Sequence, residues 1–241
     1  MAFKSDPFYF KVKGRYALFT DPYSKGGGEK VSYQVPTRQA LQGIADAAYY
    51  KPTIENVIDE VKIMNEIKTE TKGVRTLVKN GKSADLNYVS YLKDVEYLVK
   101  YHFVWNENRP DLKKDRNEYK HQAITVRSLK RGGRRDIFLG ARECTANLEY
   151  INARQYKKAK GYYYDNKNPK ISFGIMFDSF IYLAKSGEPL ISCFKPVQMI
   201  NGIIKFTDKE DCPIKKELSN YEYSFTSEIK SVAEEYEEIE E

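Results

Sequence analysis

The stretch from residue 91 to residue 105, YLKDVEYLVKYHFVW, constrains the fold of this chain more than any other feature. Its apolar side chains fall on odd positions, namely Tyr91, Val95, Tyr97, Val99, Tyr101, Phe103 and Trp105. The even positions include Asp94, Glu96, Lys100 and His102. Because the side chains of a strand alternate between its two faces, this period of two predicts a long strand over residues 88–105 with one buried face.

Further strands and helices are expected around this strand. Strands are predicted at 8–20, at 56–69 and from Ile137 to Leu139 onward, and helices at 37–50 and 117–130. This βαββαβ order indicates an α+β, ferredoxin-like (RRM-like) domain, and the short apolar runs of residues 147–208 indicate a smaller β-rich part. We predict three regions: a ferredoxin-like RNA-binding and catalytic domain over 1–145, a β-rich C-terminal subdomain over 146–215, and an acidic, disordered tail over 216–241.

The charge distribution points to a polyanionic partner. The formal net charge is +6, but residues 228–241 hold seven glutamates and one lysine, a net of −6, which leaves +12 for residues 1–227. Ten lysines and arginines stand between Arg109 and Arg135, against three acidic residues. Simple solubility is the alternative explanation of a basic surface, but such clustering is typical of a nucleic-acid footprint.

Several kinds of site are not indicated by the sequence. It has no GxxxxGK[ST] phosphate loop, no GxSxG elbow, and only two histidines, with no metal-binding spacing. Cys144, Cys193 and Cys212 have no CxxC spacing and read as reduced thiols. No apolar run is long enough to cross a bilayer and no signal peptide is recognised, so a cytoplasmic protein without membrane contact is expected.

The remaining groups suit RNA cleavage without a cofactor. The 2′-hydroxyl of RNA can attack the neighbouring phosphate once a base takes its proton and an acid protonates the leaving 5′-oxygen. Histidine can serve in either role because its unperturbed pKa lies near neutrality, and a lysine can stabilise the charge on phosphorus. His121, preceded by Lys120, is a candidate for this chemistry, although an ordinary surface histidine in a basic helix is the commoner occurrence.

Six segments resemble a known family. They are GRYALFTDP (14–22), GGEKVSYQVPT (27–37), YLKDVEYLV (91–99), NRPDL (108–112), KRGGRRDIFLGARECT (130–145) and NGIIKF (201–206). Together they resemble the type I-C (Dvulg subtype) CRISPR-associated endoribonucleases, which belong to the fifth Cas protein family of the repeat-associated mysterious protein (RAMP) superfamily. The resemblance covers roughly residues 7–215.

This resemblance implies a function. A member of the family binds the repeat hairpin of precursor CRISPR RNA and cuts at the 3′ base of the hairpin without a metal ion. If the 2′-hydroxyl is the attacking group, we expect 2′,3′-cyclic phosphate and 5′-hydroxyl ends. The protein then keeps the mature crRNA, joins the other subunits of the type I-C surveillance complex, and meets target DNA only indirectly. The family fold, a ferredoxin-like domain followed by a β-rich part, agrees with the order of elements predicted above.

The resemblance also implies catalytic residues. The family uses a tyrosine at the end of the first helix and a downstream Lys-His pair, which fall here on Tyr49 and on Lys120 and His121. His121 is then the proton-transfer residue, Lys120 stabilises the phosphorane, and Tyr49 activates or orients the 2′-hydroxyl, with the base and the acid unassigned between Tyr49 and His121. Tyr50 stands where relatives usually have tryptophan, so it could replace Tyr49 in part.

RNA-binding candidates cluster after the second predicted helix. Gly132 and Gly133 form a turn whose backbone amides could approach phosphates, while Arg134 and Arg135 would neutralise charge. The alternative is a helix C-cap with solvated arginines, and both readings can hold at once. By charge alone, further candidates are Arg116, Arg127, Lys130 and Arg131.

Two alternatives to a metal-independent nuclease remain open. The first is a non-catalytic subunit that binds the 5′ handle of the crRNA, and the presence of Tyr49, Lys120 and His121 together argues against it. The second is a metal-dependent DNA nuclease, which the lack of clustered carboxylates makes the least favoured.

Overall fold

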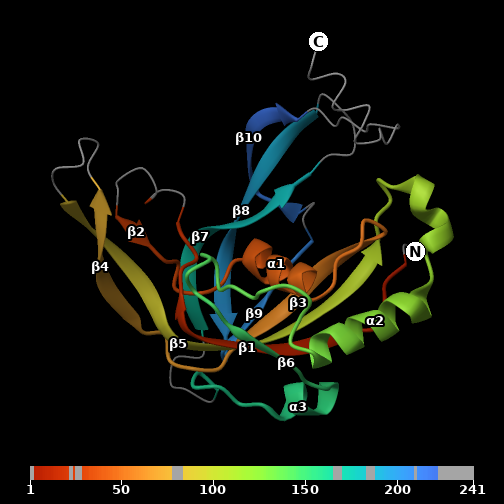
Figure 1. Ribbon diagram of the computed structural model, residues 1–241, viewed down its shortest axis with the longest axis horizontal. Helices are drawn as coiled ribbons and strands as arrows, with labels where there is room; N and C mark the ends of the chain where they lie inside the picture. The colour runs from red at the N-terminus through yellow and green to blue at the C-terminus, as the bar shows by residue number, and fades with distance from the viewer. Residues whose placement is uncertain are drawn as a thin grey trace, which may run out of the picture.

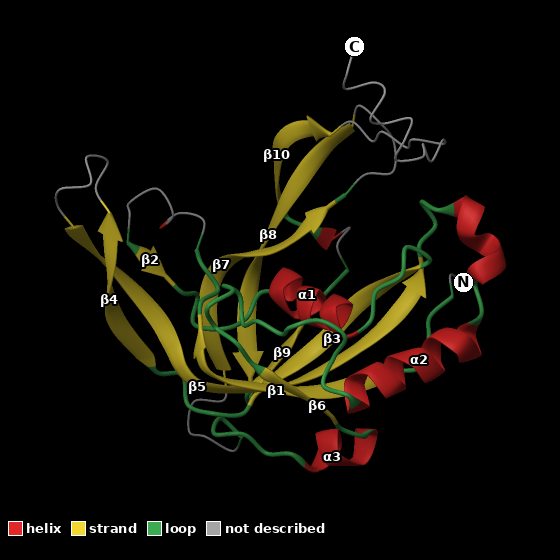
Figure 2. Ribbon diagram, in the orientation of Figure 1, coloured by secondary structure: helices red, strands yellow, loops and turns green. Residues whose placement is uncertain are grey.

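The computed structural model of the protein describes residues 3–21, 24, 29–77, 84–164, 170–182, 188–208 and 211–221. Within these residues ten strands form one mostly antiparallel sheet, with few helices (Figure 2). Neighbouring strands follow the order β10-β8-β9-β3-β5-β1-β6, while β2 and β4 also pair with β5, and β7 pairs with β8. The mixed α and β class predicted from the sequence is confirmed.

Strand β5 (Ala84–Trp105) organises the sheet. Its second half lies between β1 (Phe8–Ala17) and β3 (Ile54–Ile63), and both pair with it antiparallel. Its first half pairs antiparallel with β4 (Thr69–Leu77) and parallel with the short β2 (Lys30–Val31). The long strand expected over 88–105 is therefore present, and it begins earlier than predicted.

Both faces of β5 are covered along its second half. On the odd face Tyr97, Val99 and Phe103 are at most 2% exposed, as the alternation predicts. On the even face Leu98 packs in a second apolar cluster with Tyr156, a residue of helix α3 (Ala153–Lys158). A strand with both faces buried needs other elements on both sides of its sheet. Figure 1 shows α1 and α3 on opposite sides of the sheet.

Helix α1 (Arg38–Ala48) packs on the odd face of the sheet through residues at helical spacing, namely Leu41, Ile44, Ala45 and Ala48. The Thr37 hydroxyl caps its first turn by accepting a hydrogen bond from the Ala40 amide at 3.2 Å. The helix ends at Tyr49, which is extended, and the Asn56 side-chain amide donates to the Tyr49 carbonyl at 3.1 Å. Strand β3 thereby fixes the end of α1.

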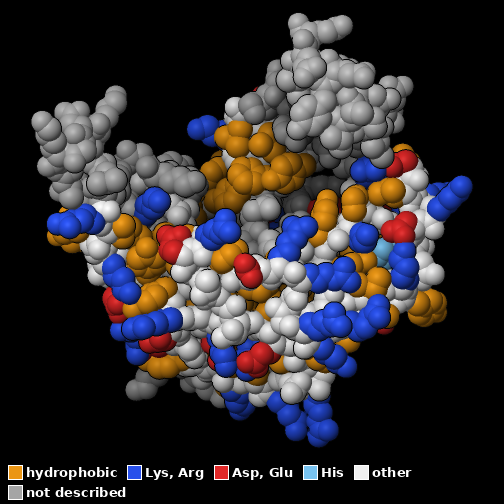
Figure 3. Space-filling view, in the orientation of Figure 1, with side chains coloured by type: hydrophobic (Ala, Val, Ile, Leu, Met, Phe, Trp, Pro, Cys, Tyr) orange, Lys and Arg blue, Asp and Glu red, His pale blue; other side chains and the backbone are white. Residues whose placement is uncertain are grey.

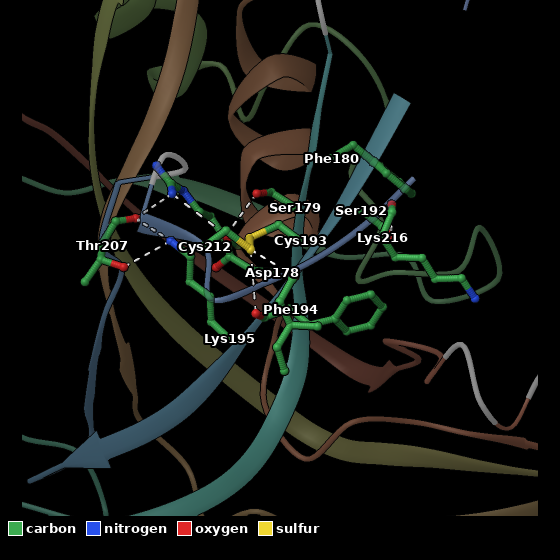
Figure 4. Close-up of a disulfide and its surroundings, with 12 residues drawn as sticks. Asp178, Ser179, Phe180, Ser192, Cys193, Phe194, Lys195, Thr207, Cys212 and Lys216 are labelled. Atoms are coloured by element: carbon green, nitrogen blue, oxygen red, sulfur yellow. Dashed lines mark hydrogen bonds and ion pairs between the residues drawn. A yellow bond between two sulfur atoms is a disulfide. The ribbon is translucent and has the colours of Figure 1, made fainter. Parts of the chain in front are cut away.

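The other end of α1 is anchored by a buried ion pair. The Arg38 guanidinium lies 3.9 Å from the Asp178 carboxylate, with both side chains 3% exposed, and it donates to the Thr207 carbonyl at 2.6 Å. Lys195 donates to the Thr207 hydroxyl at 3.0 Å (Figure 4). The predicted β-rich part thus holds the start of the helix whose end carries Tyr49.

Helix α2 (Glu118–Lys130) lies beside β6, with the Asn117 side chain accepting from the Lys120 amide at its N-terminus. The helix ends as predicted at Gly132 and Gly133, whose φ angles are +84° and +103°. Only glycine adopts such values without strain, so this turn requires both glycines.

The fourth strand lies further along the chain than predicted. Residues 137–139 form no ladder; Phe138 makes an isolated bridge to Thr145, and the strand that pairs with β1 is β6 (Asn147–Tyr150). The cause is a tight turn at Gly140, which has φ +85° and approaches the Leu18 carbonyl so closely that a Cβ there would lie 2.0 Å from its oxygen.

The C-terminal strands continue the same sheet. They are β7 (Lys170–Ile181), β8 (Glu188–Ile200), β9 (Ile203–Lys205) and β10 (Ile214–Tyr221). Because β9 pairs with β3, these strands join the central sheet directly. Residues 216–221, predicted as the start of a disordered tail, instead pair with β8, while 222–241, including the acidic segment 228–241, lie outside the described residues. The predicted domain boundary at 145/146 stays a prediction.

One prediction about the cysteines was wrong. Cys193 and Cys212 form a disulfide, with their Cα atoms 5.9 Å apart (Figure 4). Cys144 is free and buried. Cys193 lies in β8, opposite the first residues of β10, and Cys212 stands two residues before β10 begins. The register of these two strands therefore brings the sulfur atoms together, and spacing along the chain gave no sign of it.

Candidate active site and nucleic-acid interface

The three catalytic candidates meet where α1 ends and α2 begins. Tyr49 caps α1, Lys120 and His121 lie in the first turns of α2, and the Tyr49 hydroxyl lies 2.9 Å from Nδ1 of His121. Tyr49 is 2% exposed and His121 is fully buried, whereas the Lys120 side chain is 43% exposed. The structure thus brings all three together, with only Lys120 facing solvent.

The contacts of His121 define which ring nitrogen carries the proton. Nε2 lies 2.9 Å from the backbone carbonyl oxygen of Asp115. A carbonyl can only accept, so Nε2 carries hydrogen. In the neutral imidazole Nδ1 is then an acceptor, and the Tyr49 hydroxyl donates to it. The pair is therefore arranged so that His121 can receive the proton of Tyr49.

Apolar packing holds the His121 ring in this position. The Trp105 ring lies edge-on with its centroid 5.8 Å away, and the Phe103 ring lies edge-on at 6.2 Å. Both aromatic residues come from the end of β5. The long strand predicted from the alternation thus also fixes the imidazole.

Burial and two neighbouring charges shift the pKa of the Tyr49 hydroxyl. Desolvation raises the pKa of Tyr49 above its usual value, and the Asp115 carboxylate adds to this effect, while the Arg134 guanidinium opposes it. That guanidinium lies over the Tyr49 ring, 5.0 Å from its centroid. Because its pKa is raised, Tyr49 carries its proton at neutral pH, and it can take a proton from substrate only by passing its own to His121.

Asp115 links the candidates but was not identified from the sequence. Its carboxylate pairs with the Lys120 ammonium, accepts from the Thr53 hydroxyl at 2.7 Å, and lies 3.5 Å from Nε2 of His121. The hydrogen bonds from Lys120 and Thr53 lower the pKa of Asp115 below its usual value. In the sequence, Asp115 was noted only as one of three acidic residues in the basic segment 109–135. Its distance along the chain from Thr53 gives no sign that the two residues meet.

Tyr50 is placed differently from Tyr49. Its side chain is 50% exposed, and it makes no hydrogen bond to the part of the chain that the structure describes. In this arrangement the hydroxyl of Tyr49, and not that of Tyr50, contacts His121.

The glycine turn uses its backbone amides within the protein. The Gly132 and Gly133 amides donate to the Leu129 and Ser128 carbonyls of α2, at 3.0 and 2.9 Å. The Arg134 and Arg135 amides both donate to the carbonyl of Ala47 at 3.2 Å. All four amides expected to approach phosphates are thus engaged, and the turn presents guanidinium groups instead.

The remaining basic candidates divide into two groups. Arg127, Lys130 and Arg131 are exposed along α2 and its end, and Figure 3 shows lysines and arginines spread over this face of the molecule. Arg116 is different, since its guanidinium pairs with Glu107 at 3.1 Å and its side chain is 15% exposed. It stabilises the segment before α2 and offers little surface to RNA.

Within the described ranges, no group of three or more His, Cys, Asp or Glu side chains is arranged to hold a metal ion. No helix in the part of the chain that the structure describes is both long and apolar enough to cross a membrane.

Known proteins resemble this chain closely. A curated relative from Mannheimia succiniciproducens, named CRISPR pre-crRNA endoribonuclease Cas5d, is 31% identical over 164 residues, which cover 58% of this chain and 71% of the relative. A relative of the same name from Thermus thermophilus is 30% identical over 111 residues, which cover 42% of this chain and 47% of the relative.

Two solved structures share the fold. One, described as a CRISPR-associated protein, has 46% identity and a TM-score of 0.77, covering 90% of this chain and 99% of its own. The other, a functionally uncharacterized protein from Streptococcus mutans, has 48% identity and a TM-score of 0.76, and the match covers 90% of this chain and 100% of that protein's chain. A family model described as CRISPR-associated protein (Cas_Cas5), specific for Cas5d, matches residues 9–207. The resemblance inferred from the sequence is therefore confirmed, and the chain belongs to the Cas5d family of CRISPR-associated proteins.

Proposed function

We propose that this chain is a metal-independent endoribonuclease that cleaves precursor CRISPR RNA at the 3′ base of its repeat hairpin. Its relatives are named pre-crRNA endoribonucleases. The observation that carries the proposal is the hydrogen bond of 2.9 Å between the Tyr49 hydroxyl and Nδ1 of His121, with Lys120 one residue away. These groups can move a proton and stabilise negative charge without a metal ion.

In the proposed reaction Tyr49 and His121 act together as the base. The Tyr49 oxygen takes the proton of the 2′-hydroxyl while its own proton passes to Nδ1 of His121, and the 2′-oxygen attacks phosphorus. The bond from phosphorus to the 5′-oxygen then breaks. The 5′ product ends in a 2′,3′-cyclic phosphate, and the other product begins with a 5′-hydroxyl.

Lys120 supplies the positive charge in this scheme. Its ammonium is paired with Asp115 in the free protein and is the solvent-facing member of the three groups. A bound scissile phosphate competes with the Asp115 carboxylate for this ammonium, which then stabilises the phosphorane and protonates the leaving 5′-oxygen. Solvent then returns a proton to Lys120 and takes up the extra proton from His121.

The exposed basic residues bind the RNA backbone in this proposal. Arg127, Lys130, Arg131, Arg134 and Arg135 contact phosphates of the repeat hairpin. After cleavage the protein retains the mature crRNA in the cytoplasm as a subunit of the type I-C surveillance complex, and it meets target DNA only through that complex.

The fold supports a ferredoxin-like assignment. The elements β1, α1, β3, β5, α2 and β6 follow the βαββαβ order, and their strands lie side by side as β3-β5-β1-β6. We assign the N-terminal part to this arrangement. It explains why the ends of two helices packed on one sheet can share a site.

A second candidate is favoured by one observation. Tyr49 and His121 are almost completely buried, as expected for a structural pair in a subunit that only binds the 5′ handle of the crRNA. The two functions differ in whether the wild-type chain cleaves the repeat RNA.

One experiment separates the candidates. The cognate repeat RNA, and an RNA carrying a single 2′-deoxy substitution 5′ to the cut, are each incubated with protein in Mg²⁺ and, in parallel, in EDTA. Cleavage of the first RNA alone, with a cyclic phosphate product and about a 10²- to 10⁴-fold loss in His121→Ala and in Lys120→Ala, supports the nuclease. Cleavage of both RNAs in Mg²⁺ that is lost in EDTA indicates metal-activated water and a DNase-like chemistry. No cleavage of either RNA in Mg²⁺ or in EDTA leaves the handle-binding function.

A further inference from the structure

Two adjoining hollows lie beside the candidate active site. One, of about 430 Å³, is lined by the basic turn, including Arg131, Arg134 and Arg135. The other, of about 240 Å³, is lined by one face of α1 and by residues of the segment after the basic turn, including Phe138. Asp136 lines both hollows. The second hollow, here called the α1 groove, has no role in the function proposed above.

The floor of the α1 groove is nearly bare backbone. Ala40, Gly43 and Ala47 recur every three to four residues and so share one face of the helix over about 10 Å, which is the span of seven residues. A Cβ added at Gly43 would meet nothing within 4 Å. Phe138 also lines the groove, so a bare helix face and an aromatic side chain are both available to contact a planar base.

The wall formed by residues 136–140 is held firmly in place. The Ala146 amide donates to the Ile137 carbonyl at 2.9 Å, and the Leu139 amide donates to the Cys144 carbonyl at 2.8 Å. The Leu18 amide donates to the Leu139 carbonyl at 2.9 Å, which ties the wall to the chain just beyond β1. The groove is therefore largely formed before any ligand arrives.

Asp136 is the chemically informative residue. Its side chain is exposed, and its carboxylate makes no hydrogen bond or ion pair with the described residues, although it shares a hollow with three arginines. A carboxylate at a phosphate-binding surface repels the backbone of RNA. Its two acceptor oxygens can offset that repulsion by binding two adjacent N–H donors.

Guanine is the base with that donor pattern. Its Watson–Crick edge presents N1–H and the N2 amino group side by side, whereas adenine and cytosine place one amino group beside an acceptor, and uracil has a single N–H. Single-stranded RNA is read in this way, by stacking of a base together with hydrogen bonds to its Watson–Crick edge.

The groove also continues the path of the RNA. The Arg134 guanidinium lies over the Tyr49 ring, and the Arg134 amide donates to the carbonyl of Ala47, which lines the groove. A strand whose phosphates lie on Arg134 and Arg135 can therefore place a base against Ala47 and Gly43.

We propose that the α1 groove is a guanine-binding subsite, in which Asp136 accepts hydrogen bonds from N1–H and N2–H of a guanine close to the cleaved bond. The proposal rests on the proposed function, since it takes the ligand to be RNA. The base stacks between the bare face of α1 and Phe138, and the neighbouring phosphate lies on the arginines.

The test uses mononucleotides, which separate base recognition from cleavage. Binding of GMP, IMP, AMP, CMP and UMP to the full chain is measured by calorimetry. We expect GMP to bind about tenfold more tightly than the other four, including IMP, which lacks only the N2 amino group. Equal affinity for all five nucleotides would overturn the proposal.

Three variants locate the site. Asp136→Asn should lose the preference for GMP and gain affinity for AMP, because a carboxamide offers one acceptor and one donor. Gly43→Leu should abolish GMP binding by filling the groove, whereas Gly43→Ala, whose Cβ has open space, should retain it. Retention of the GMP preference by both Asp136→Asn and Gly43→Leu would place the base elsewhere and refute the subsite.

A further comparison distinguishes this proposal from the function on which it rests. GMP preference should persist in His121→Ala, since His121 does not line the groove. Normal RNA cleavage together with no GMP preference contradicts the subsite alone. GMP preference in a chain that does not cleave the repeat contradicts the nuclease function and leaves the subsite standing.

Discussion

At the scale of single residues, Asp115 is the residue whose role in positioning charged groups is easiest to distinguish from a role in packing. It contacts Lys120, Thr53 and His121 from a partly exposed position, so its removal leaves no apolar cavity. If Asp115 only held the local structure, its loss would weaken RNA binding and cleavage together. If it positions the charged groups, the two quantities change in opposite directions.

We predict that Asp115→Asn lowers the cleavage rate about 10- to 100-fold while RNA affinity stays equal or rises, because one negative charge leaves the phosphate site. Single-turnover cleavage and filter binding measure the two effects. Asp111→Asn is the matched control, since Asp111 lies in the same 3₁₀ helix, Pro110–Asp115, and pairs only with Arg109 in the described chain. A parallel fall in affinity and rate would contradict the positioning role.

The same comparison has a pH dependence of known sign. Hydrogen bonds from Lys120 and Thr53 lower the pKa of Asp115 below its usual value, so the carboxylate is ionised throughout the neutral range. The contribution of Asp115 is present above that pKa and disappears as the pH falls through it. The rates of wild type and Asp115→Asn should therefore differ by a constant factor from about pH 6 to pH 8.

The sequence identified candidate site residues where they stand next to each other in a recognisable motif. The neighbours Lys120 and His121 were found from a family motif, and the structure places Nδ1 of His121 2.9 Å from the Tyr49 hydroxyl. Thr53 and Asp115 carry no such motif, because they reach the site through the end of β3 and a short 3₁₀ helix. These two residues meet only in the folded chain, so no local sequence pattern predicts their contact.

At the scale of elements, the turn after α2 has two separable functions. Its glycine and arginine amides close α2 and cap α1 through the Ala47 carbonyl, while its arginine side chains remain available. Substitution of the side chains should therefore change RNA binding without opening the turn.

We predict that Arg134→Ala combined with Arg135→Ala weakens RNA binding and reduces the slope of log affinity against log salt by about 0.7 to 0.9 for each lost phosphate contact. Titrations at several salt concentrations measure the slope. Lys157→Ala with Lys158→Ala removes the same charge from α3, on the opposite side of the sheet, and should leave the slope unchanged. Equal slopes in wild type and the arginine variant would show that these arginines contact no phosphate.

Elements were predictable where one face of a segment is buried. The alternation over β5 and the helical stripe of α1 survive in the structure because each packs one side against a common core. The fourth strand was misplaced because residues 137–139 are apolar for another reason: Ile137 and Leu139 are buried beside a turn imposed by Gly140. Apolar character alone does not distinguish a strand from a buried loop.

At the scale of the whole molecule, the C-terminal strands are held to one another by the disulfide between Cys193 and Cys212. The two residues are 19 positions apart, so the bond closes a loop of moderate length and restricts the unfolded chain. Such a loop contributes about 3 kcal/mol to the free energy of unfolding.

We predict that a reductant lowers the thermal midpoint by roughly 6 to 12 °C, as expected for this free energy in a chain of this size. The double variant Cys193→Ser with Cys212→Ser should start at the lower midpoint and show no further effect of reductant. Thiol labelling of the unfolded, non-reduced protein should find one reactive cysteine, Cys144. Three labelled thiols together with an unchanged midpoint would contradict a disulfide in solution.

The overall sheet could not be predicted from the sequence, since its pairing joins segments far apart in the chain. Strand β9 pairs with β3, and β6 pairs with β1, across more than a hundred residues in each case. The order of elements indicated an α+β class, but neither composition nor periodicity specifies which strand edges meet. The disulfide escaped prediction for the same reason.

A nuclease that shares a cell with every other RNA must leave most of them intact, and in the proposed reaction the burial of Tyr49 and His121 would contribute to that discrimination. An RNA that binds while Tyr49 and His121 stay buried would meet no reactive hydroxyl in that reaction. Each 1.4 kcal/mol or so by which the covered arrangement is favoured lowers the cleavage of such bystander RNAs about tenfold. A repeat hairpin that binds the uncovered arrangement more tightly compensates for that penalty with its own binding energy. Under the proposed function, concealment would act as a checkpoint before the chemical step, and fidelity would depend on the free energy of exposing the Tyr49 hydroxyl as well as on the catalytic groups.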